Sequence, residues 1–454
     1  MEKNSLFDRV NEWIKRSITL KLLSIGILIL ILLIPTSMLT SLIRERQDVR
    51  NEAIQEVSSK WGNRQTLGGP VLSIPYLVDI KDEKGAIVRE KRYAHFLPDE
   101  LSVSGDVNPE QRHRGIYVVV LYNTQLEVKG KFGIPDIKAA GLTEASCLLD
   151  EAFISVGISD LRGINDDIVC RLNDSTFTFG PGIPTHDLFS SGLSFHYPLT
   201  SLKAFDFDFK VNLNGSSGLS FLPFGKVTTV AVNSNWGNPS FEGSFLSDTH
   251  SVRNNGFNAQ WKVLQLNRNY PQQGTGNFIG NLSEMQDDNF TISGQNDSGS
   301  FGVRLLLPVD EYLKTMRSVK YCLMFVIITF LTFFFVEVIN KRRIHPIQYL
   351  LVGFAVCLFY VLLLSISEHL SFNMAYLLSC VLILSLITFY AKHIFKNNKL
   401  TGIFSVLLML LYGFFFSLLQ LEDYALLLGS IGLFIILATI MILTRRVNWY
   451  RDQD

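Results

Sequence analysis

Apolar positions in this chain gather into six long stretches, separated by short polar links except for one long interval after the first stretch. Each stretch is about 20 residues long, and a helix of that length crosses the ~30 Å hydrocarbon core of a bilayer. The predicted transmembrane helices cover residues 20–43, 319–339, 347–366, 373–390, 402–421 and 424–444. The pattern therefore predicts an integral membrane protein built on an α-helical bundle of six transmembrane helices.

The links between these helices alternate in charge, and the alternation predicts the orientation of the chain. Lys and Arg resist translocation, so cationic links mark the cytoplasmic side. Fourteen cations lie in residues 1–21, in the links after the second and fourth helices, and in the tail at 445–454, whereas the links at 367–372 and 422–423 contain none. We expect a multi-pass protein of a plasma membrane, with both termini in the cytoplasm and residues 44–317 exported.

The exported interval, residues 44–317, has the periodicity of β-strands. From Phe205 to Leu213, apolar residues occupy every second position and Asp, Lys or Asn the others, as in a strand with one buried face. The sequence Gly215-Ser216-Ser217-Gly218 predicts a turn after this strand. Further short strands are predicted at 117–122, 126–132, 153–159, 176–179 and 226–233. This spacing favours an antiparallel, sandwich-like β region, as one domain or two.

Helical segments are expected on both sides of the β region. Residues 46–61 and 309–319 would form two stems that connect it to the first and second transmembrane helices. Residues 1–19 place apolar side chains at helical spacing, which suits either an amphipathic helix in the inner interface or an extension of the first span. The apolar run of the first span exceeds that of a signal peptide, so we interpret it as a retained anchor.

Charge balance excludes some classes of partner. The whole chain has 41 basic and 41 acidic residues, but the exported interval has 26 basic against 32 acidic. A mildly acidic exported region argues against nucleic acid and against its docking on anionic headgroups. The expected partners are the lipid bilayer and, in the envelope, proteins, lipids or cell-wall components. The oligomeric state stays open.

The five cysteines divide by compartment. Cys322, Cys357 and Cys380 fall within predicted spans, where a thiol acts as a small apolar side chain. Cys147 and Cys170 fall in the exported region, where oxidising conditions permit a disulfide. The sequence fits either a Cys147–Cys170 bond or two free thiols.

Ionisable side chains in a span are costly, so each one suggests a function. Glu337 lies one helical turn before Lys341, and such a pair shares a helix face. The two interpretations are a structural ion pair and a carboxylate that carries a proton or binds a cation. His345 precedes Pro346 at the start of the third span, where Pro suits the first helical turn.

Four further polar residues lie at the outer ends of the spans: Glu368, His369, Glu422 and Asp423. They could form a polar mouth that binds a divalent ion or a basic segment, or they could be ordinary polar turn residues. No HExxH, GxSxG or Walker sequence occurs, and the histidines of the exported region lack metal-ligand spacing. We therefore predict no catalytic residues, no metal and no cofactor.

Several segments resemble the CreD family of bacterial inner membrane proteins, in order along nearly the whole chain. They include 67–70, Arg114-Gly115-Ile116-Tyr117, Ser159-Asp160-Leu161-Arg162-Gly163, 222–223, 234–241, 256–261, 367–369, 425–429 and 449–450. The most specific is His345-Pro346-Ile347-Gln348-Tyr349-Leu350-Leu351-Val352-Gly353, which adds Gln348 to the candidate polar residues. The resemblance implies an inner membrane protein associated with cell-envelope integrity and envelope stress, and it brings no established catalytic residues.

Three functions are compatible with this sequence. The first is a non-enzymatic inner membrane protein whose exported β region binds or organises envelope components. The second is a transporter or lipid-handling protein that uses the helix bundle with Glu337 and the outer acids. The third is a membrane-embedded enzyme acting on lipid or peptidoglycan, which lacks a recognisable catalytic constellation.

Overall fold

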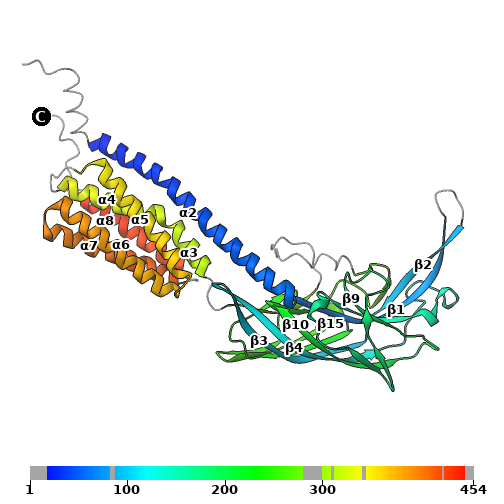
Figure 1. Ribbon diagram of the computed structural model, residues 1–454. Coiled ribbons are helices and arrows are strands. Elements are labelled where there is room, and N and C mark those ends of the chain that lie inside the picture. Colours follow the sequence, from blue (N-terminus) through cyan, green and yellow to red (C-terminus); the bar gives the residue numbers. More distant parts are fainter. Residues whose placement is uncertain are drawn as a thin grey trace, which may run out of the picture. The chain divides into compact units, whose positions relative to one another are not determined.

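A computed structural model of the protein describes residues 18–81, 87–279, 299–307, 311–339, 344–421 and 424–444. The chain forms two compact units, one helical (residues 1–50 and 309–454) and one rich in β-structure (residues 51–308). Each unit is described by itself (Figure 1). The predicted N-terminal segment, residues 1–19, lies almost entirely outside the described residues.

Seven described helices account for the helical unit and for the first turns of the β unit. Helix α2 is 44 residues long, and its last residues belong to the β unit. The helices are α2 (Ile18–Trp61), α3 (Glu311–Lys320), α4 (Cys322–Ile339), α5 (Pro346–Ser367), α6 (Phe372–Phe395), α7 (Asn398–Gln420) and α8 (Ala425–Thr444). Both predicted stems are helical. Helix α2 continues through the first stem to Trp61, and α3 forms the second stem just before α4.

The number of spans differs from the six predicted. Four described helices are long and apolar enough to cross a membrane: α2, α5, α6 and α7. A fifth arises if α3 and α4 count as one span, bent by 43° between Lys320 and Cys322. In α8 the described apolar part is shorter, Leu427–Thr439. The sequence predicts a change from a polar stem to an apolar span near residue 319, but a hydrophobic pattern gives no angle between two consecutive helices.

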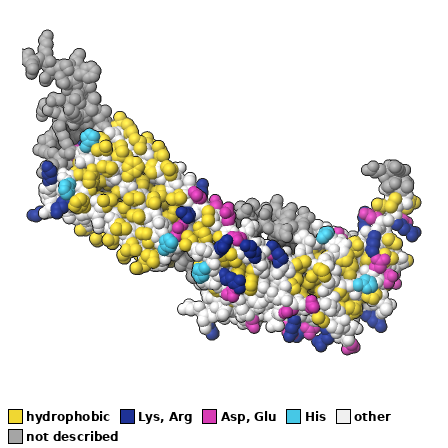
Figure 2. Space-filling view, viewed as in Figure 1, with side chains coloured by type: hydrophobic (Ala, Val, Ile, Leu, Met, Phe, Trp, Pro, Cys, Tyr) yellow, Lys and Arg dark blue, Asp and Glu magenta, His cyan; other side chains and the backbone are white. Residues whose placement is uncertain are grey.

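The core of the helical unit is aromatic. Phe325 of α4 packs against Phe359 of α5 and against Tyr412 and Phe415 of α7. Outward-facing Leu, Ile and Phe side chains remain exposed along α5 to α8, and hydrophobic side chains cover the face of this unit that Figure 2 shows. Apolar exposure of this extent suits a lipid environment.

The β unit is a sandwich of two sheets, which confirms the predicted β region. The nine-stranded sheet contains β1 (Gln65–Lys81), β2 (Ile87–Phe96), β5 (Phe153–Ile158), β8 (Gly180–Pro181), β9 (Gly192–His196), β11 (Gly218–Phe221), β13 (Pro239–Gly243), β16 (Gln273–Thr275) and β17 (Phe301–Leu305). The eight-stranded sheet contains β3 (Glu100–Arg114), β4 (Tyr117–Phe132), β6 (Val169–Leu172), β7 (Ser175–Thr178), β10 (Phe205–Ser216), β12 (Val227–Ser234), β14 (Thr249–Arg253) and β15 (Gly256–Leu264).

One continuous core joins the inner faces of both sheets, so the β region forms a single compact unit. Most strand pairs are antiparallel, but β1 pairs with β11 and β3 with β12 in parallel. The predicted strands at 117–122 and 126–132 are one strand, β4, which forms a long hairpin with β3. The predicted turn at 215–218 is a crossing point where the chain leaves β10 and enters β11 in the other sheet.

Candidate functional site

Glu337, the deepest ionisable residue of the predicted spans, is buried and fully engaged by the protein. Its side chain forms an ion pair with Lys21 of α2. Oε1 also accepts a hydrogen bond from the backbone N–H of Ile344 at 2.9 Å, and Oε2 accepts one from the hydroxyl of Tyr349 at 3.0 Å. One carboxylate therefore connects α2, α4 and the start of α5.

The described ion-pair partner of Glu337 comes from a distant part of the chain. Lys21 lies in a helix more than three hundred positions earlier, whereas Lys341, the predicted partner one turn away, lies outside the described residues, so that pairing stays a prediction. A buried carboxylate needs a counter-charge and hydrogen bonds to offset its desolvation. Lys21, Tyr349 and Ile344 supply both, which is the arrangement of a structural ion pair.

His345 and Gln348 begin helix α5. Nδ1 of His345 accepts a hydrogen bond from the backbone N–H of Ile347 at 3.4 Å, and Oε1 of Gln348 accepts one from the backbone N–H of His345 at 3.0 Å. This is a reciprocal capping box, with Pro346 in the first turn. The pair therefore has the helix-start role that the sequence suggested for His345.

The segment 345–353 also determines how closely α2 packs. A Cβ added at Gly353 would lie 2.2 Å from Cδ1 of Leu32, a buried residue of α2. A side chain at this position would require Leu32 to move, so glycine permits the close approach of α5 and α2, in the way that small residues permit close helix packing in membranes. With Tyr349 bound to Glu337, the segment caps α5 and fixes α2 and α4 against it.

The outer acids are only partly described. Glu368 is the C-cap residue of α5, and its Oε1 lies 3.7 Å from Nε of Arg46 in α2. His369 is exposed, and its backbone N–H donates to the carbonyl of Ile366. Glu422 and Asp423 lie outside the described residues, so the predicted polar mouth stays a prediction.

Helix α2 therefore carries an ion pair near each end of its apolar segment. Lys21 and Arg46 are 25 positions apart, which corresponds to about 38 Å along a helix. The hydrocarbon core is about 30 Å thick, so both charges fall at or just beyond its edges. The two pairs thus fix the position of α2 along the bilayer normal relative to α4 and α5.

A second group of polar contacts lies in the β unit, where α2 ends and β1 begins. Asp160 accepts hydrogen bonds from the backbone N–H of Asn63 at 3.0 Å and from the guanidinium of Arg162 at 2.8 and 2.9 Å. Burial raises the pKa of Asp160, but these hydrogen bonds outweigh burial and hold the pKa below its ordinary value. A Cβ at Gly163 would lie 2.2 Å from the carbonyl oxygen of Asn214.

The tip of the β3–β4 hairpin contacts the end of α2. The guanidinium of Arg114 donates to both carboxylate oxygens of Glu56 at 3.1 and 3.2 Å. That of Arg112 lies over the ring of Trp61, 4.2 Å from its centre. Hydrogen bonds from Lys60 and from Arg114 lower the pKa of Glu56. We call these contacts, together with those of Asp160, the helix–sheet junction.

The sandwich also contains a Ser–His–Asp chain that the sequence did not reveal. Oγ of Ser73 lies 2.8 Å from Nδ1 of His95, and Nε2 of His95 lies 3.0 Å from Oδ2 of Asp187. The order resembles that of a hydrolase triad, but Ser73 and His95 are each only 1% exposed. A nucleophile must meet its substrate, so this arrangement serves as a buried connection between β1, β2 and the loop before β9.

The two cysteines of the β unit are free thiols. Cys147 pairs by a β-bridge with Tyr76 in the nine-stranded sheet, and Cys170 lies in β6 of the eight-stranded sheet. Their backbones belong to different sheets of the sandwich. Burial raises the pKa of Cys170 to about 12. Within the described ranges, no group of three His, Cys, Asp or Glu could hold a metal ion.

The sequence identifies most of the site residues but not the residues with which they pair. Lys21 was counted only as a topology signal, and Asp160 and Arg114 entered only as points of resemblance. Helical and strand periodicities report neighbours a few positions away, whereas these contacts join distant segments. The unusual charge of Glu337 within an apolar run was the signal that located the first cluster.

The chain is similar to known proteins over nearly its whole length. The model of a family described as "Inner membrane protein CreD" matches residues 17–450. A protein of Escherichia coli (strain K12), also described as "Inner membrane protein CreD", is 31% identical over 434 residues. The match covers 93% of this chain and 91% of that relative.

Proposed function

Since this chain belongs to the CreD family of inner membrane proteins, we propose that it supports cell-envelope integrity or the envelope stress response without catalysing a reaction. In this proposal both termini are cytoplasmic and the β unit is periplasmic. The β unit binds or organises envelope components, and the helical unit holds it at the membrane. Its partners are the bilayer and envelope proteins, lipids or cell-wall material.

One observation carries the proposal: four of the candidate polar residues of the spans, Glu337, His345, Gln348 and Glu368, already have partners within the protein. Glu337 has a counter-ion and two hydrogen bonds, and Gln348 with His345 caps a helix. Glu368 lies beside Arg46. A group that moves a proton or an ion must exchange partners during its cycle. Groups that connect helices do not, which favours an anchoring role.

The helix–sheet junction supports the same function from the β unit. Helix α2 is continuous from Ile18 to Trp61, and its last residues bind β-unit side chains through Glu56, Trp61 and the segment that follows. We infer that the junction holds the end of α2 in the β unit.

The orientation in this proposal rests on the cationic links, and it requires an even number of spans. The bent pair α3–α4 must therefore cross once, and α8 must cross as the last span. At 20 residues, α8 is long enough, since it extends about 30 Å.

The alternative is a transporter or lipid-handling protein, and the burial of Glu337 in the bundle is the observation that favours it. Both functions can be separated by neutralising the acids without deleting their hydrogen bonds. A glutamine at position 337 can still accept from Ile344 and donate to Tyr349. We would express Glu337→Gln/Glu368→Gln in a strain that lacks the protein, and score survival in detergent and leakage of periplasmic proteins.

We expect this double variant to restore both phenotypes at normal membrane levels. A matched variant at the junction, Asp160→Ala, should insert into the membrane but restore neither phenotype. If the neutralised variant reaches normal levels and fails while Asp160→Ala succeeds, the working site lies in the bundle and the anchoring proposal is wrong.

A further inference from the structure

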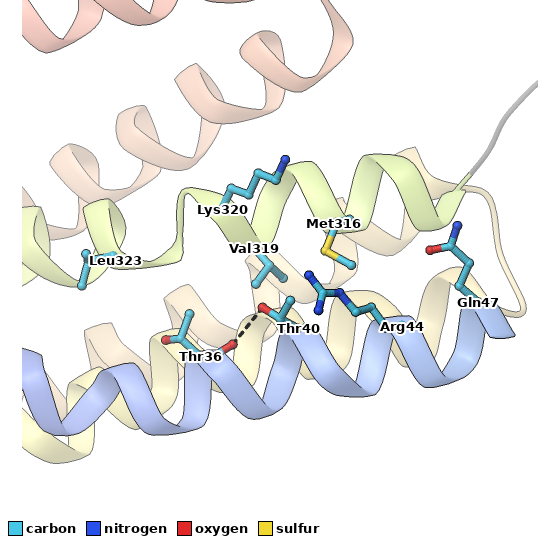
Figure 3. Close-up of a pocket in the computed structure, with 8 residues that line it drawn as sticks. All are labelled: Thr36, Thr40, Arg44, Gln47, Met316, Val319, Lys320 and Leu323. Atoms are coloured by element: carbon cyan, nitrogen blue, oxygen red, sulfur yellow. Dashed lines mark hydrogen bonds between the residues drawn. The ribbon is translucent and has the colours of Figure 1, made fainter. Parts of the chain in front are cut away.

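A cavity of about 410 Å³ lies in the helical unit between α2 and the bent pair α3–α4. Its volume falls in the range of small-molecule sites, about 300–1,000 Å³. Figure 3 shows Thr36, Thr40, Arg44 and Gln47 of α2 on one side of it, and Met316 and Val319 of α3 with Leu323 of α4 on the other. The bent pair turns by 43° after Lys320, next to the lining residues Val319 and Leu323.

The lining of the cavity changes from polar to apolar along its length. At one end, Arg44 and Gln47 provide a guanidinium and an amide just beyond the apolar segment of α2. At the other end, Val319 and Leu323 provide an apolar wall, and Thr36 lies about 16 Å from Gln47 along the helix. An occupant that fills it must therefore be amphipathic, with its polar end toward Gln47.

The charge inside the cavity is that of Arg44. Its side chain points toward Met316 in Figure 3, whereas Lys320 lies at the rim and points away from α2. Arg46, two residues later, is paired with Glu368 on another side of α2. Among the described residues, Arg44 has no carboxylate within ion-pair distance. Thr36 and Thr40 donate their hydroxyl protons to carbonyls one turn earlier, so both can only accept.

We propose that this cavity binds one anionic phospholipid, with its phosphate on Arg44 and Gln47 and the start of an acyl chain against Val319 and Leu323. A guanidinium at the edge of the hydrocarbon core matches the level of a lipid phosphate. A free phosphate ion would leave the apolar half empty. Leu33, which lies on the same side of α2 one turn before Thr36, is exposed, and a second acyl chain can extend into the bilayer there.

The test is lipid binding to the full-length protein in mild detergent, measured by native mass spectrometry. Phosphatidylglycerol, phosphatidylcholine and inorganic phosphate are added separately. We expect a one-to-one complex with phosphatidylglycerol that inorganic phosphate does not displace. Arg44→Gln loses a charge-assisted hydrogen bond, so its affinity for phosphatidylglycerol should fall at least about tenfold. Arg44→Lys should retain part of the binding.

Arg317→Gln is the matched control, because it removes the same charge from an exposed position of α3 that does not line the cavity. Thr40→Leu, which fills the cavity from α2 while preserving the helix, should also abolish binding. Thermal unfolding in the same detergent verifies that each variant is folded. The proposal is wrong if Arg317→Gln loses as much phosphatidylglycerol binding as Arg44→Gln does, or if Thr40→Leu binds phosphatidylglycerol undiminished. It is also wrong if phosphatidylcholine binds as well as phosphatidylglycerol, or if inorganic phosphate displaces the bound lipid.

Discussion

From the ion pair between Lys21 and Glu337 we predict that removing one partner destabilises the protein more than removing the other. The Glu337 side chain is 6% exposed and that of Lys21 is 27% exposed. In Glu337→Gln, the lysine loses its partner but its long side chain can reach water at the membrane edge. In Lys21→Met, the carboxylate stays buried without a counter-charge. We therefore expect Lys21→Met to be the more destabilising change, although it removes the more exposed residue.

The magnitude follows from the contacts that remain. Removing one partner of a buried ion pair costs about 3–5 kcal/mol. In Lys21→Met the hydrogen bonds from Tyr349 and Ile344 still stabilise the carboxylate, and each contributes about 1 kcal/mol. We expect a loss of about 1–3 kcal/mol for Lys21→Met and a smaller loss, below about 1 kcal/mol, for Glu337→Gln. The double variant should resemble Glu337→Gln, which gives a double-mutant cycle.

Buried thiols provide the assay. Cys322 and Cys357 lie in the core of the helical unit and react with a thiol-sensitive dye only after that unit unfolds. Replacing Cys147, Cys170 and the half-buried Cys380 by serine restricts the signal to the two buried thiols of the helical unit. At about 2–4 °C per kcal/mol, Lys21→Met should lower the melting temperature by about 2–12 °C.

The outer ion pair supplies the control for this experiment. Arg46 and Glu368 are 3.7 Å apart, and the Arg46 side chain is 47% exposed. Arg46→Gln should therefore cost less than about 1 kcal/mol. If Glu337→Gln lowers the melting temperature as much as Lys21→Met does, burial of an unpaired carboxylate is not the governing cost, and the argument fails.

Three further predictions concern the β unit. A hydrogen bond from His95 lowers the pKa of Asp187 in the folded protein. The stabilisation from this carboxylate is therefore present above the ordinary Asp pKa of about 3.9 and is lost as pH falls through the lower folded value. When the unfolding free energy is measured against acid pH, Asp187→Asn should lose less stability than the unchanged protein. Gly163→Ala should destabilise the unit by about 1–3 kcal/mol, because its Cβ would meet a β10 carbonyl at 2.2 Å, and chemical denaturation would show no change if that contact relaxes freely. Cys147 should react with maleimide before Cys170, whose thiol is buried with a pKa of about 12; the reverse order in a mass-spectrometric time course would contradict the burial.

The elements with strong periodicity were predictable from sequence. The alternation from Phe205 to Leu213 predicted β10, and the apolar runs located α5, α6 and α7 within a few residues. These signals work because each reports which face of one element is buried. The bend between α3 and α4 left no such signal, since both sides of Lys320 and Cys322 are equally able to be helical.

Partnerships across the fold were the part that sequence could not supply. The local rule for helix pairs gave Lys341 as the partner of Glu337, whereas the described ion pair joins Glu337 to Lys21. The same limit applies to Ser73, His95 and Asp187, which come from three separate segments. A strand pairing joins positions far apart in the chain, and no periodicity encodes which strand becomes the neighbour.

Two of the segments that carry the family resemblance act on the same helix. The segment 345–353 binds α2 through Gly353 and, by way of Glu337, through Lys21. The segment 159–163 binds the residues that follow α2 through Asp160. Helix α2 runs from Ile18 to Trp61 between these contacts. The segments that carry the resemblance thus include partners of α2 in each of the two units, which gives the resemblance a physical meaning that a list of matching residues does not.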